Sequence, residues 1–139
     1  MINLNIKLDE GAFMPIRAYK TDAGLDLMTP IDVEIPAHGN CFIDTGVHME
    51  IPSGYFGKLE TKSGLNSKHI VSMGGVIDAN YTGSIKVILY NLSENSFLFN
   101  RGDKIIQIII QPCEYPYLHI VEKLSDSERG NNGFGSSGK

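Results

Sequence analysis

Apolar and polar positions along most of the chain alternate with the short period of β-strands. Ile31, Val33 and Ile35 are separated by acidic residues, and Pro36 then breaks the run. Because successive side chains of a strand point to opposite faces, this pattern predicts a strand with one buried face. Turn residues separate six further segments in which we predict strands: Met1–Leu8, Phe42–Met49, Tyr55–Thr61, Ile85–Tyr90, Phe97–Phe99 and Lys104–Gln111.

The segment Lys104–Gln111 differs from the others because isoleucine fills most of its positions. Such a run is typical of a strand that is buried on both faces. Left exposed at an edge it would promote aggregation, which favours a closed homo-oligomer. Ser63–His69 is the best place for a single short helix. Many short strands with one short helix predict an all-β sandwich or barrel.

Bulk composition narrows the class of protein. A chain of 139 residues with 42% hydrophobic and 20% charged residues indicates one globular domain. The formal charge of −4 argues against a broad nucleic-acid surface, and no apolar run is long enough to span a membrane. The two cysteines follow no metal-binding or disulfide pattern, so we expect a cytoplasmic protein. Composition changes at Ser125, which predicts a body over residues 1–124 and a flexible arm over 125–139.

Two glycine-containing segments in the first half of the chain carry candidate chemistry. Asp22–Leu27 could present Asp26 to the water shell of Mg²⁺, a cation that prefers oxygen ligands, although a plain turn explains the segment equally well. Thr61–Leu65 places a lysine, a serine and a glycine where a helix could begin, as in a small anion site. Ser63 also suits a helix N-cap, and the sequence does not choose between these roles.

The segment Gly74–Gly83 is the strongest internal signal. Asp78 lies between an apolar stretch and a turn, an environment that can hold a carboxylate beside a reacting water. Asn80 and Gly83 suit a hairpin turn, and Tyr81 adds a ring with a polar end. The alternative is an ordinary β-hairpin in which Asp78 only accepts turn hydrogen bonds.

Two later segments complete the set. Gln107 interrupts the isoleucine-rich strand, and a buried amide must either be bonded within the core or face a ligand. The tail from Arg129 to Lys139 combines one arginine, one phenylalanine, two serines and four glycines. Arginine can bind phosphate through two parallel hydrogen bonds, and Phe134 offers a face on which a base can stack. The tail therefore indicates a nucleotide lid, with a disordered terminus as the alternative.

In order and spacing, these five segments resemble the five motifs of the trimeric dUTPase family (deoxyuridine triphosphate nucleotidohydrolases). The resemblance covers Asp22 to Gly138. It implies a jelly-roll-like distorted β-barrel with one short helix and a flexible C-terminal arm. It also implies a homotrimer with three shared active sites that hydrolyses dUTP to dUMP and pyrophosphate with Mg²⁺. Such an activity keeps uracil out of DNA and supplies dUMP for thymidylate synthesis.

The resemblance also implies a role for each matching residue. Asp78 matches the catalytic aspartate that activates the attacking water, and Tyr81 matches the ring that packs on the deoxyribose. Asp26 matches the aspartate that contacts the metal through water. The residues that match substrate-binding positions of the family are Lys62, Ser63, Gly64, Gly75, Ile77, Asn80, Tyr81, Gln107, Arg129, Phe134, Gly135, Ser136 and Ser137.

Two departures and two alternatives accompany this assignment. Lys62 stands where the family usually has arginine, which keeps the charge but loses the planar fork, so we expect weaker phosphate positioning. Asn131-Asn132 stands where the arm often has a small residue and glycine. A dCTP deaminase-like enzyme of the same superfamily is one alternative, although Gly74–Gly83 offers Asp78 and no glutamate. The other is a nucleotide-gated trimer that binds an unidentified protein partner.

Overall fold

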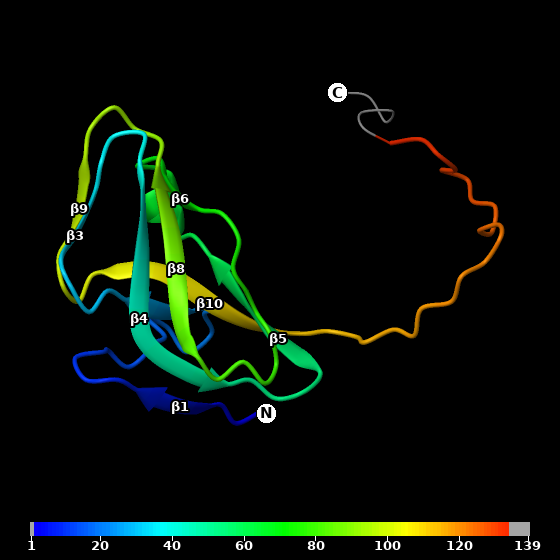
Figure 1. Cartoon of the computed structure of the whole chain (residues 1–139), viewed down its shortest axis with the longest axis horizontal. Coiled ribbons are helices and arrows are strands. Elements are labelled where there is room, and N and C mark those ends of the chain that lie inside the picture. The colour runs from blue at the N-terminus through cyan, green and yellow to red at the C-terminus, as the bar shows by residue number, and fades with distance from the viewer. Residues whose placement is uncertain (1, 134–139) are drawn as a thin grey trace.

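A computed structural model describes residues 2–133, and their strands form antiparallel sheets (Figure 1). The first sheet has the order β1 (Asn5–Leu8), β4 (Asn40–Glu50), β8 (Ser84–Asn91) and β6 (Ile70–Ser72). The second has the order β2 (Leu25–Met28), β10 (Lys104–Pro112), β5 (Tyr55–Glu60) and β7 (Val76–Ile77). The strands β3 (Val33–Ile35) and β9 (Phe97–Phe99) pair separately. Over these residues the sheets form a jelly-roll-like β-structure that does not close into a complete barrel.

The core lies between the two larger sheets and follows from their period-two pattern. In β8, the buried residues Ile85, Val87 and Leu89 alternate with the exposed Lys86 and Ile88. From the second sheet, Leu27, Leu59 and the isoleucines of β10 belong to the same cluster of buried side chains. Hydrophobic burial on the facing sides of two sheets is the main stabilising contribution to such a fold.

Most of the predicted elements are confirmed. Every segment predicted as a strand contains one, and the short helix α1 spans Ser63–Asn66. Three short strands, β2, β6 and β7, were not separately predicted, because each has only two to four residues.

The prediction of a hairpin over Gly74–Gly83 is wrong. β7 pairs with β5 in the second sheet, whereas β8 pairs with β4 and β6 in the first sheet. The intervening turn therefore crosses from one sheet to the other. A turn-rich segment between two apolar runs does not reveal which partner each run will find, since strand pairing is decided by the whole fold.

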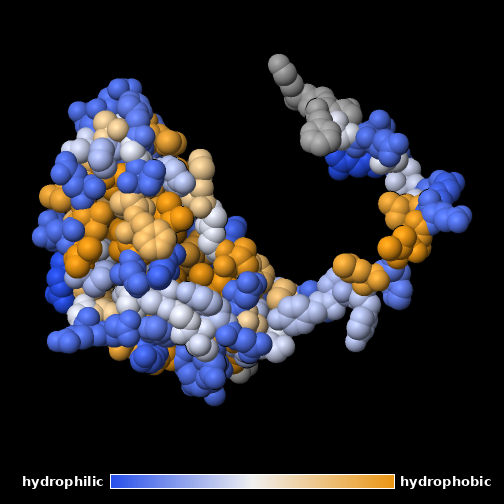
Figure 2. Space-filling view, viewed as in Figure 1, coloured by the Kyte–Doolittle hydropathy of each residue, from blue (hydrophilic) through white to orange (hydrophobic). Residues whose placement is uncertain are grey.

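The chain leaves the body of the protein after β10 ends at Pro112 (Figure 1). Cys113 and Tyr115 still contact the loop at Gly54, whose N–H donates to the Tyr115 hydroxyl at 3.2 Å. Beyond them the chain extends away from the sheets, and Figure 2 shows apolar side chains along it. Leu118, Ile120 and Leu124 are at least 81% exposed. The boundary between body and arm at residue 124 stays a prediction.

The outer face of the first sheet also carries apolar side chains (Figure 2). Phe42 on β4 and Ile88 on β8 are opposite each other in register and are both exposed. Contiguous apolar surface of this kind often marks an interface. Within residues 2–133, no helix has the length and apolarity needed to cross a bilayer.

Candidate active site

Asp26 on β2 is a buried carboxylate held by two lysines. Its residue is 4% exposed, and the Lys104 Nζ lies 2.8 Å from one of its oxygens. Lys62 Nζ hydrogen-bonds the other oxygen. We call Asp26, Lys62, Lys104 and Gln107 the lysine–aspartate site. Because the two cations face one anion, this site carries an excess of positive charge towards solvent.

The electrostatics of Asp26 reflect two opposing effects. Burial alone would raise the pKa of its carboxyl group, because it removes water from the charged form. Hydrogen bonds and charge from Lys104 and Lys62 outweigh this effect and hold the pKa below its ordinary value. Asp26 is therefore ionised in the folded protein across the physiological pH range.

A β-bulge in β10 brings the side chains of this site to one face. The register with β2 shifts between Lys104 and Ile106, so that Gln107 lies opposite Asp26 while Lys104 still reaches the same carboxylate. Bulges re-aim side chains in this way. Gly24 packs directly on Gln107, because a Cβ at Gly24 would lie 2.9 Å from the Gln107 Cβ. Gly24 is therefore needed for the placement of the amide. Lys104 is not among the residues predicted from the sequence, since a strand pattern contains no signal for a bulge.

The start of α1 completes this end of the site. Lys62 occupies the N-cap position and makes no side-chain cap hydrogen bond, so the N-cap role considered for Ser63 is wrong. Ser63 and Gly64 are exposed. No heavy atom lies within 4 Å of the position a Cβ would take at Gly64. The hydroxyl and the open backbone are thus accessible beside the Lys62 ammonium group.

The turn Asp78–Gly83, which we call the Asp78 turn, carries the other predicted group. Ile77 is 9% exposed and packs in the core, so only its main chain is available to a ligand. Asp78 is exposed, and its carbonyl oxygen accepts a hydrogen bond from the Tyr81 N–H at 3.2 Å. Asn80 has φ 68°, a left-handed conformation that asparagine tolerates better than most residues.

A cavity of about 250 Å³ opens beside this turn. Asp78, Ala79 and Asn80 line one side of it, and β5 with the segment after β10 lines the other. The remaining lining residues, which sequence reasoning missed, are Ser53, Tyr55, Phe56, Cys113 and Tyr115. They come from two segments that are far from the turn in sequence, so no local motif identifies them.

Upstream of the turn, Gly75 fixes the approach of the chain to β5. Its φ is 123°, and a Cβ there would lie 2.5 Å from the Leu59 Cβ. Its carbonyl oxygen accepts a hydrogen bond from the Leu59 N–H at 2.7 Å. A side chain at this position would push β7 away from β5.

The lysine–aspartate site and Asp78 lie at opposite ends of β5. Ile77, next to Asp78, is opposite Gly57, whereas Gln107 is opposite Glu60. Asp78 therefore lies near Phe56, four residues before Glu60, which corresponds to about 13 Å of extended chain. Within one copy of the chain, a single phosphorus atom of a bound triphosphate therefore cannot lie beside Asp78 and beside the lysine–aspartate site at the same time.

The predicted arm residues lie apart from both groups or outside the described part of the chain. Arg129 is exposed, and its Nε donates a hydrogen bond to the Asn132 carbonyl oxygen at 2.8 Å within the arm itself. Phe134, Gly135, Ser136 and Ser137 lie outside the described residues. Their predicted roles therefore stay predictions.

The donor set at Asp26 fits Mg²⁺ only as an outer contact. Within residues 2–133, no cluster of three His, Cys, Asp or Glu side chains could hold a metal ion. Both Asp26 oxygens already accept hydrogen bonds from lysine. A Mg²⁺ ion coordinated mainly by water and phosphate oxygens is compatible with this arrangement, because such an ion retains several waters.

Comparison with known proteins assigns the family. A family profile described as dUTPase matches residues 10–138. The deoxyuridine 5'-triphosphate nucleotidohydrolase of Paramecium bursaria Chlorella virus 1 is 38% identical over 133 residues, which cover 95% of this chain and 94% of the viral protein. The Mus musculus protein with the same description is 38% identical over 135 residues, covering 96% of this chain and 83% of its own.

Solved structures that are similar to this chain belong to the same family as the curated relatives. A mutant dUTPase of Staphylococcus bacteriophage 80alpha, determined with dUpNHpp, is 33% identical, has a TM-score of 0.94 and covers 100% of both chains. A mutant dUTPase from phage phi11 of S. aureus, described as coordinating a structural Mg(II) ion, is 31% identical with a TM-score of 0.83. It covers 90% of this chain and 100% of the phage protein. The family profile, the curated relatives and the solved structures lead to the same conclusion: the chain belongs to the dUTPase family.

Proposed function

We propose that this protein hydrolyses dUTP to dUMP and pyrophosphate by attack of water on the α-phosphorus. The observation that carries the proposal is the position of Asp78, an exposed carboxylate at the edge of a cavity that is large enough for a ring. The family match over residues 10–138 and a relative determined with a dUTP analogue support the substrate.

Asp78 is the proposed catalytic base. Its carboxylate accepts a proton from water as the water oxygen forms a bond to the α-phosphorus. The bond between that phosphorus and the bridging oxygen breaks, and pyrophosphate leaves with the electron pair. Little covalent chemistry is needed from the protein, so orientation of the water and neutralisation of charge dominate the barrier.

The Asp78 turn and the residues before it are proposed to recognise the nucleoside. Main-chain groups between Gly75 and Tyr81 can read the donor and acceptor pattern of uracil, which is reversed in cytosine. A site built on hydrogen bonds rejects such a mismatch by roughly 10⁴-fold. The Tyr81 ring, 43% exposed, is proposed to pack on deoxyribose and to leave no room for a 2′-hydroxyl group.

The lysine–aspartate site is proposed to bind the triphosphate. Lys62, Lys104 and the Gln107 amide are donors, and Ser63 and Gly64 offer a hydroxyl and open backbone. When bound, Mg²⁺ would neutralise phosphate charge, with Asp26 as an outer contact through water. Asp26 itself orients Lys62 and Lys104, because it accepts a hydrogen bond from each.

The arm is proposed to close over the bound nucleotide. Arg129 would contact the terminal phosphate, and Phe134 would stack over uracil, with Gly135, Ser136 and Ser137 beside the phosphates. Closure would exclude water from the site at the cost of ordering the arm.

We propose a homotrimer with shared active sites because, within one chain, Asp78 lies far from the lysine–aspartate site. The lysine–aspartate site and Asp78 lie about 13 Å apart along β5. The arm also extends away from both (Figure 1). Exposed Phe42 and Ile88 provide apolar surface for packing between subunits.

The direct test of the function is release of pyrophosphate from dUTP, dCTP, dTTP and UTP, with and without Mg²⁺. We expect Mg²⁺-stimulated release from dUTP, with the other three nucleotides hydrolysed far more slowly. A protein that leaves dUTP intact at millimolar Mg²⁺ contradicts the proposal. Release of ammonia from dCTP would instead support the deaminase alternative.

Shared sites are tested by mixing two inactive variants. Asp78→Asn and Arg129→Ala proteins, denatured and refolded together in equal amounts, would form mixed trimers. If the aspartate and the arginine of one site come from different chains, about a quarter of the sites regain both groups. No recovery of activity above that of the separately refolded variants would show that one chain supplies both.

A further inference from the structure

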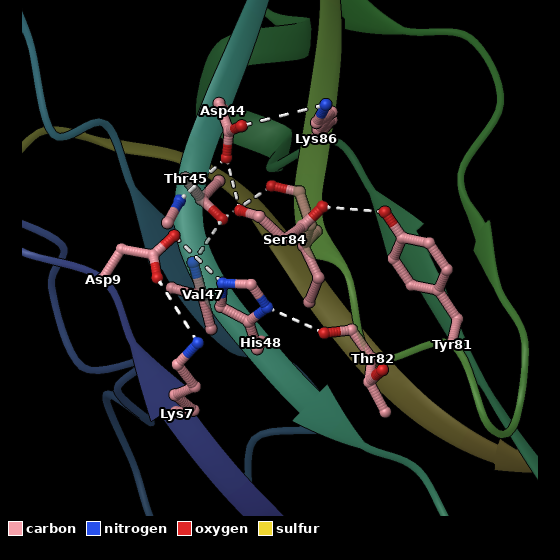
Figure 3. A network of polar contacts seen from close by, with 12 residues as sticks. Lys7, Asp9, Asp44, Thr45, Val47, His48, Tyr81, Thr82, Ser84 and Lys86 are labelled. Atoms are coloured by element: carbon pink, nitrogen blue, oxygen red, sulfur yellow. Dashed lines mark hydrogen bonds and ion pairs between the residues drawn. The ribbon is translucent and has the colours of Figure 1, made fainter.

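A second irregularity of the sheets lies in β4, next to the Asp78 turn. The register between β4 and β8 shifts between Asp44 and His48, so that four residues of β4 span the length of two residues of β8. Gly46, inside this bulge, has φ 67°, and the Thr45 hydroxyl donates a hydrogen bond to the Ile85 carbonyl oxygen at 2.7 Å. The bulge turns the His48 side chain towards the end of the Asp78 turn (Figure 3).

Both ring nitrogens of His48 face atoms that can only accept hydrogen bonds. Nδ1 lies 2.7 Å from the Thr82 carbonyl oxygen, and Nε2 lies 3.0 Å from an Asp9 carboxylate oxygen. A neutral imidazole has a single N–H and can satisfy only one of them, whereas imidazolium satisfies both. The side chain is 18% exposed, so water competes weakly for these contacts.

The Thr82 carbonyl belongs to the segment that fixes the Tyr81 ring. The Tyr81 hydroxyl donates a hydrogen bond to the Ser84 carbonyl oxygen at 3.0 Å. The ring folds back over Gly83, where a Cβ would lie 2.5 Å from the Tyr81 hydroxyl oxygen. The Ser84 hydroxyl is in turn bonded to Asp44 (Figure 3). By contacting the Thr82 carbonyl, His48 thus fixes the peptide group between Tyr81 and Ser84, the residue to which the Tyr81 hydroxyl is bonded.

We propose that His48 is a positioning residue for Tyr81, and that its hydrogen bond to the Thr82 carbonyl sets how strongly the enzyme prefers a deoxyribonucleotide over a ribonucleotide. This inference rests on the proposed function, because it concerns the ring that packs on the substrate sugar. His48 contacts neither the candidate base nor the phosphate site. It therefore acts on selectivity and leaves the reaction with the bound deoxynucleotide unchanged.

The surroundings of the imidazole make this positioning dependent on pH. Charged side chains near it come from three strands and the loop after β1, and are Lys7, Asp9, Asp44, Glu50 and Lys86. The hydrogen bonds to Asp9 and to Thr82 raise the pKa of His48 above its ordinary value, against burial and the charge of Lys7. Imidazolium, with both hydrogen bonds, therefore persists at low pH and is lost as pH rises through the raised pKa.

Loss of one proton affects Thr82 more than Asp9. An anionic acceptor binds a donor more strongly than a neutral carbonyl does, so the neutral ring keeps its proton on Nε2. The Nδ1 lone pair then faces the Thr82 carbonyl oxygen and repels it. The Thr82–Gly83 peptide loosens, and discrimination against the 2′-hydroxyl group falls.

The test compares two substitutions that each keep one of the two hydrogen bonds. The amide nitrogen of His48→Asn takes the place of Nδ1 and reaches Thr82, whereas that of His48→Gln takes the place of Nε2 and reaches Asp9. The readout is kcat/KM for dUTP divided by kcat/KM for UTP, measured from pH 6 to pH 9. The ratio cancels the titration of the phosphates and of uracil, because these groups are common to both substrates.

We expect His48→Gln to lower this ratio about 10-fold with kcat for dUTP unchanged. His48→Asn should stay within about 2-fold of the wild-type ratio at pH 6 and should remove the decline that the wild type shows at high pH. His38→Asn is the matched control, since His38 also contacts a carboxylate, that of Glu94 at 3.0 Å. His38 precedes the end of β4 that pairs with Tyr90, whereas the turn adjoins the opposite end of the β4–β8 pair.

Four outcomes would count against the inference. Equal ratios for His48→Asn and His48→Gln would show that the Thr82 hydrogen bond does not set selectivity. An equal change in His38→Asn would show a general effect of histidine loss. A wild-type protein that leaves dUTP intact overturns the proposed function and with it this inference, whereas an active wild type whose ratio survives His48→Gln overturns this inference alone.

Discussion

The two halves of the candidate site lie at the two ends of β5 and differ in burial and in hydrogen bonding. At one end, Asp26 is 4% exposed and both its oxygens are hydrogen-bonded to lysine. At the other end, Asp78 is exposed beside a cavity, and its turn is held by hydrogen bonds from main-chain atoms and from His48. The first half is a charged group fixed within strands, and the second is a carboxylate at the tip of a crossing turn.

This difference is consistent with the two proposed tasks. A phosphate site needs cations whose positions do not change, and a buried counter-ion on a strand provides that constraint. A general base needs contact with water and substrate, which burial in a strand would prevent. The comparison predicts that substitutions at the lysine–aspartate site affect stability and binding together, whereas those in the Asp78 turn affect turnover or selectivity alone.

Asp78→Asn should give the largest effect. We expect turnover of dUTP to fall by about 10²-fold or more, because the amide cannot accept the proton from water. The melting temperature should stay unchanged, since the side chain is exposed. Pyrophosphate release and thermal unfolding of the purified protein measure the two quantities. Near-normal turnover would remove Asp78 from the role of base.

Asp26→Asn should change stability as well as activity. The substitution leaves two lysine ammonium groups beside a neutral amide, and we expect the free energy of unfolding to fall by about 1–3 kcal/mol, allowing for the partial exposure of both lysines. Glu94→Gln is the control, because the Glu94 side chain is 87% exposed and contacts His38 at 3.0 Å. Its cost should stay below about 1 kcal/mol. Equal costs would show that burial of Asp26 is unimportant.

The pH dependence of stability sharpens the same comparison. The folded-state pKa of Asp26 lies below the ordinary value of 3.8, so its contribution is present above that pH and is lost as pH falls through the lowered pKa. The free energy of unfolding of the wild type, measured with urea, should therefore fall more steeply with decreasing pH than that of Asp26→Asn. Parallel curves below pH 4 would contradict the assigned ion pair.

Gly83→Ala should affect selectivity alone. The new methyl group would lie 2.5 Å from the Tyr81 hydroxyl oxygen and 2.6 Å from the adjacent ring carbon, so the exposed ring must move. We expect the preference for dUTP over UTP to fall about 10-fold with little loss of stability. Tyr81→Phe, which keeps the ring and removes its hydroxyl, separates steric displacement from loss of the Ser84 hydrogen bond. An unchanged preference in Gly83→Ala would contradict the role of the ring.

Lys62→Arg should give the smallest effect. Arginine restores the planar fork that is common in the family and can still bond Asp26, so we expect KM for dUTP to fall about 2- to 3-fold at constant kcat. Lys104→Arg serves as the comparison at the second lysine. A raised KM in Lys62→Arg would show that the geometry of the pair with Asp26 matters more than the contact with phosphate.

The sequence by itself determined the strands and the residues with reactive groups. The alternation of Ile31, Val33 and Ile35 with acidic residues identifies a strand with one buried face, since the period of a strand is a local property of the backbone. Asp26, Lys62 and Asp78 were found because each lies in a segment that contains turn glycines, and Gln107 because it interrupts an apolar run. Their order along the chain carries the resemblance to the family.

Only the tertiary structure decided which of these residues lie together. β7 and β8 are consecutive in sequence but belong to different sheets, and this separates Asp78 from the phosphate site. Two bulges, in β10 and in β4, turned Lys104 towards Asp26 and His48 towards Thr82. Pairing and register depend on the packing of strands distant in sequence, and that packing energy is not encoded in any single segment.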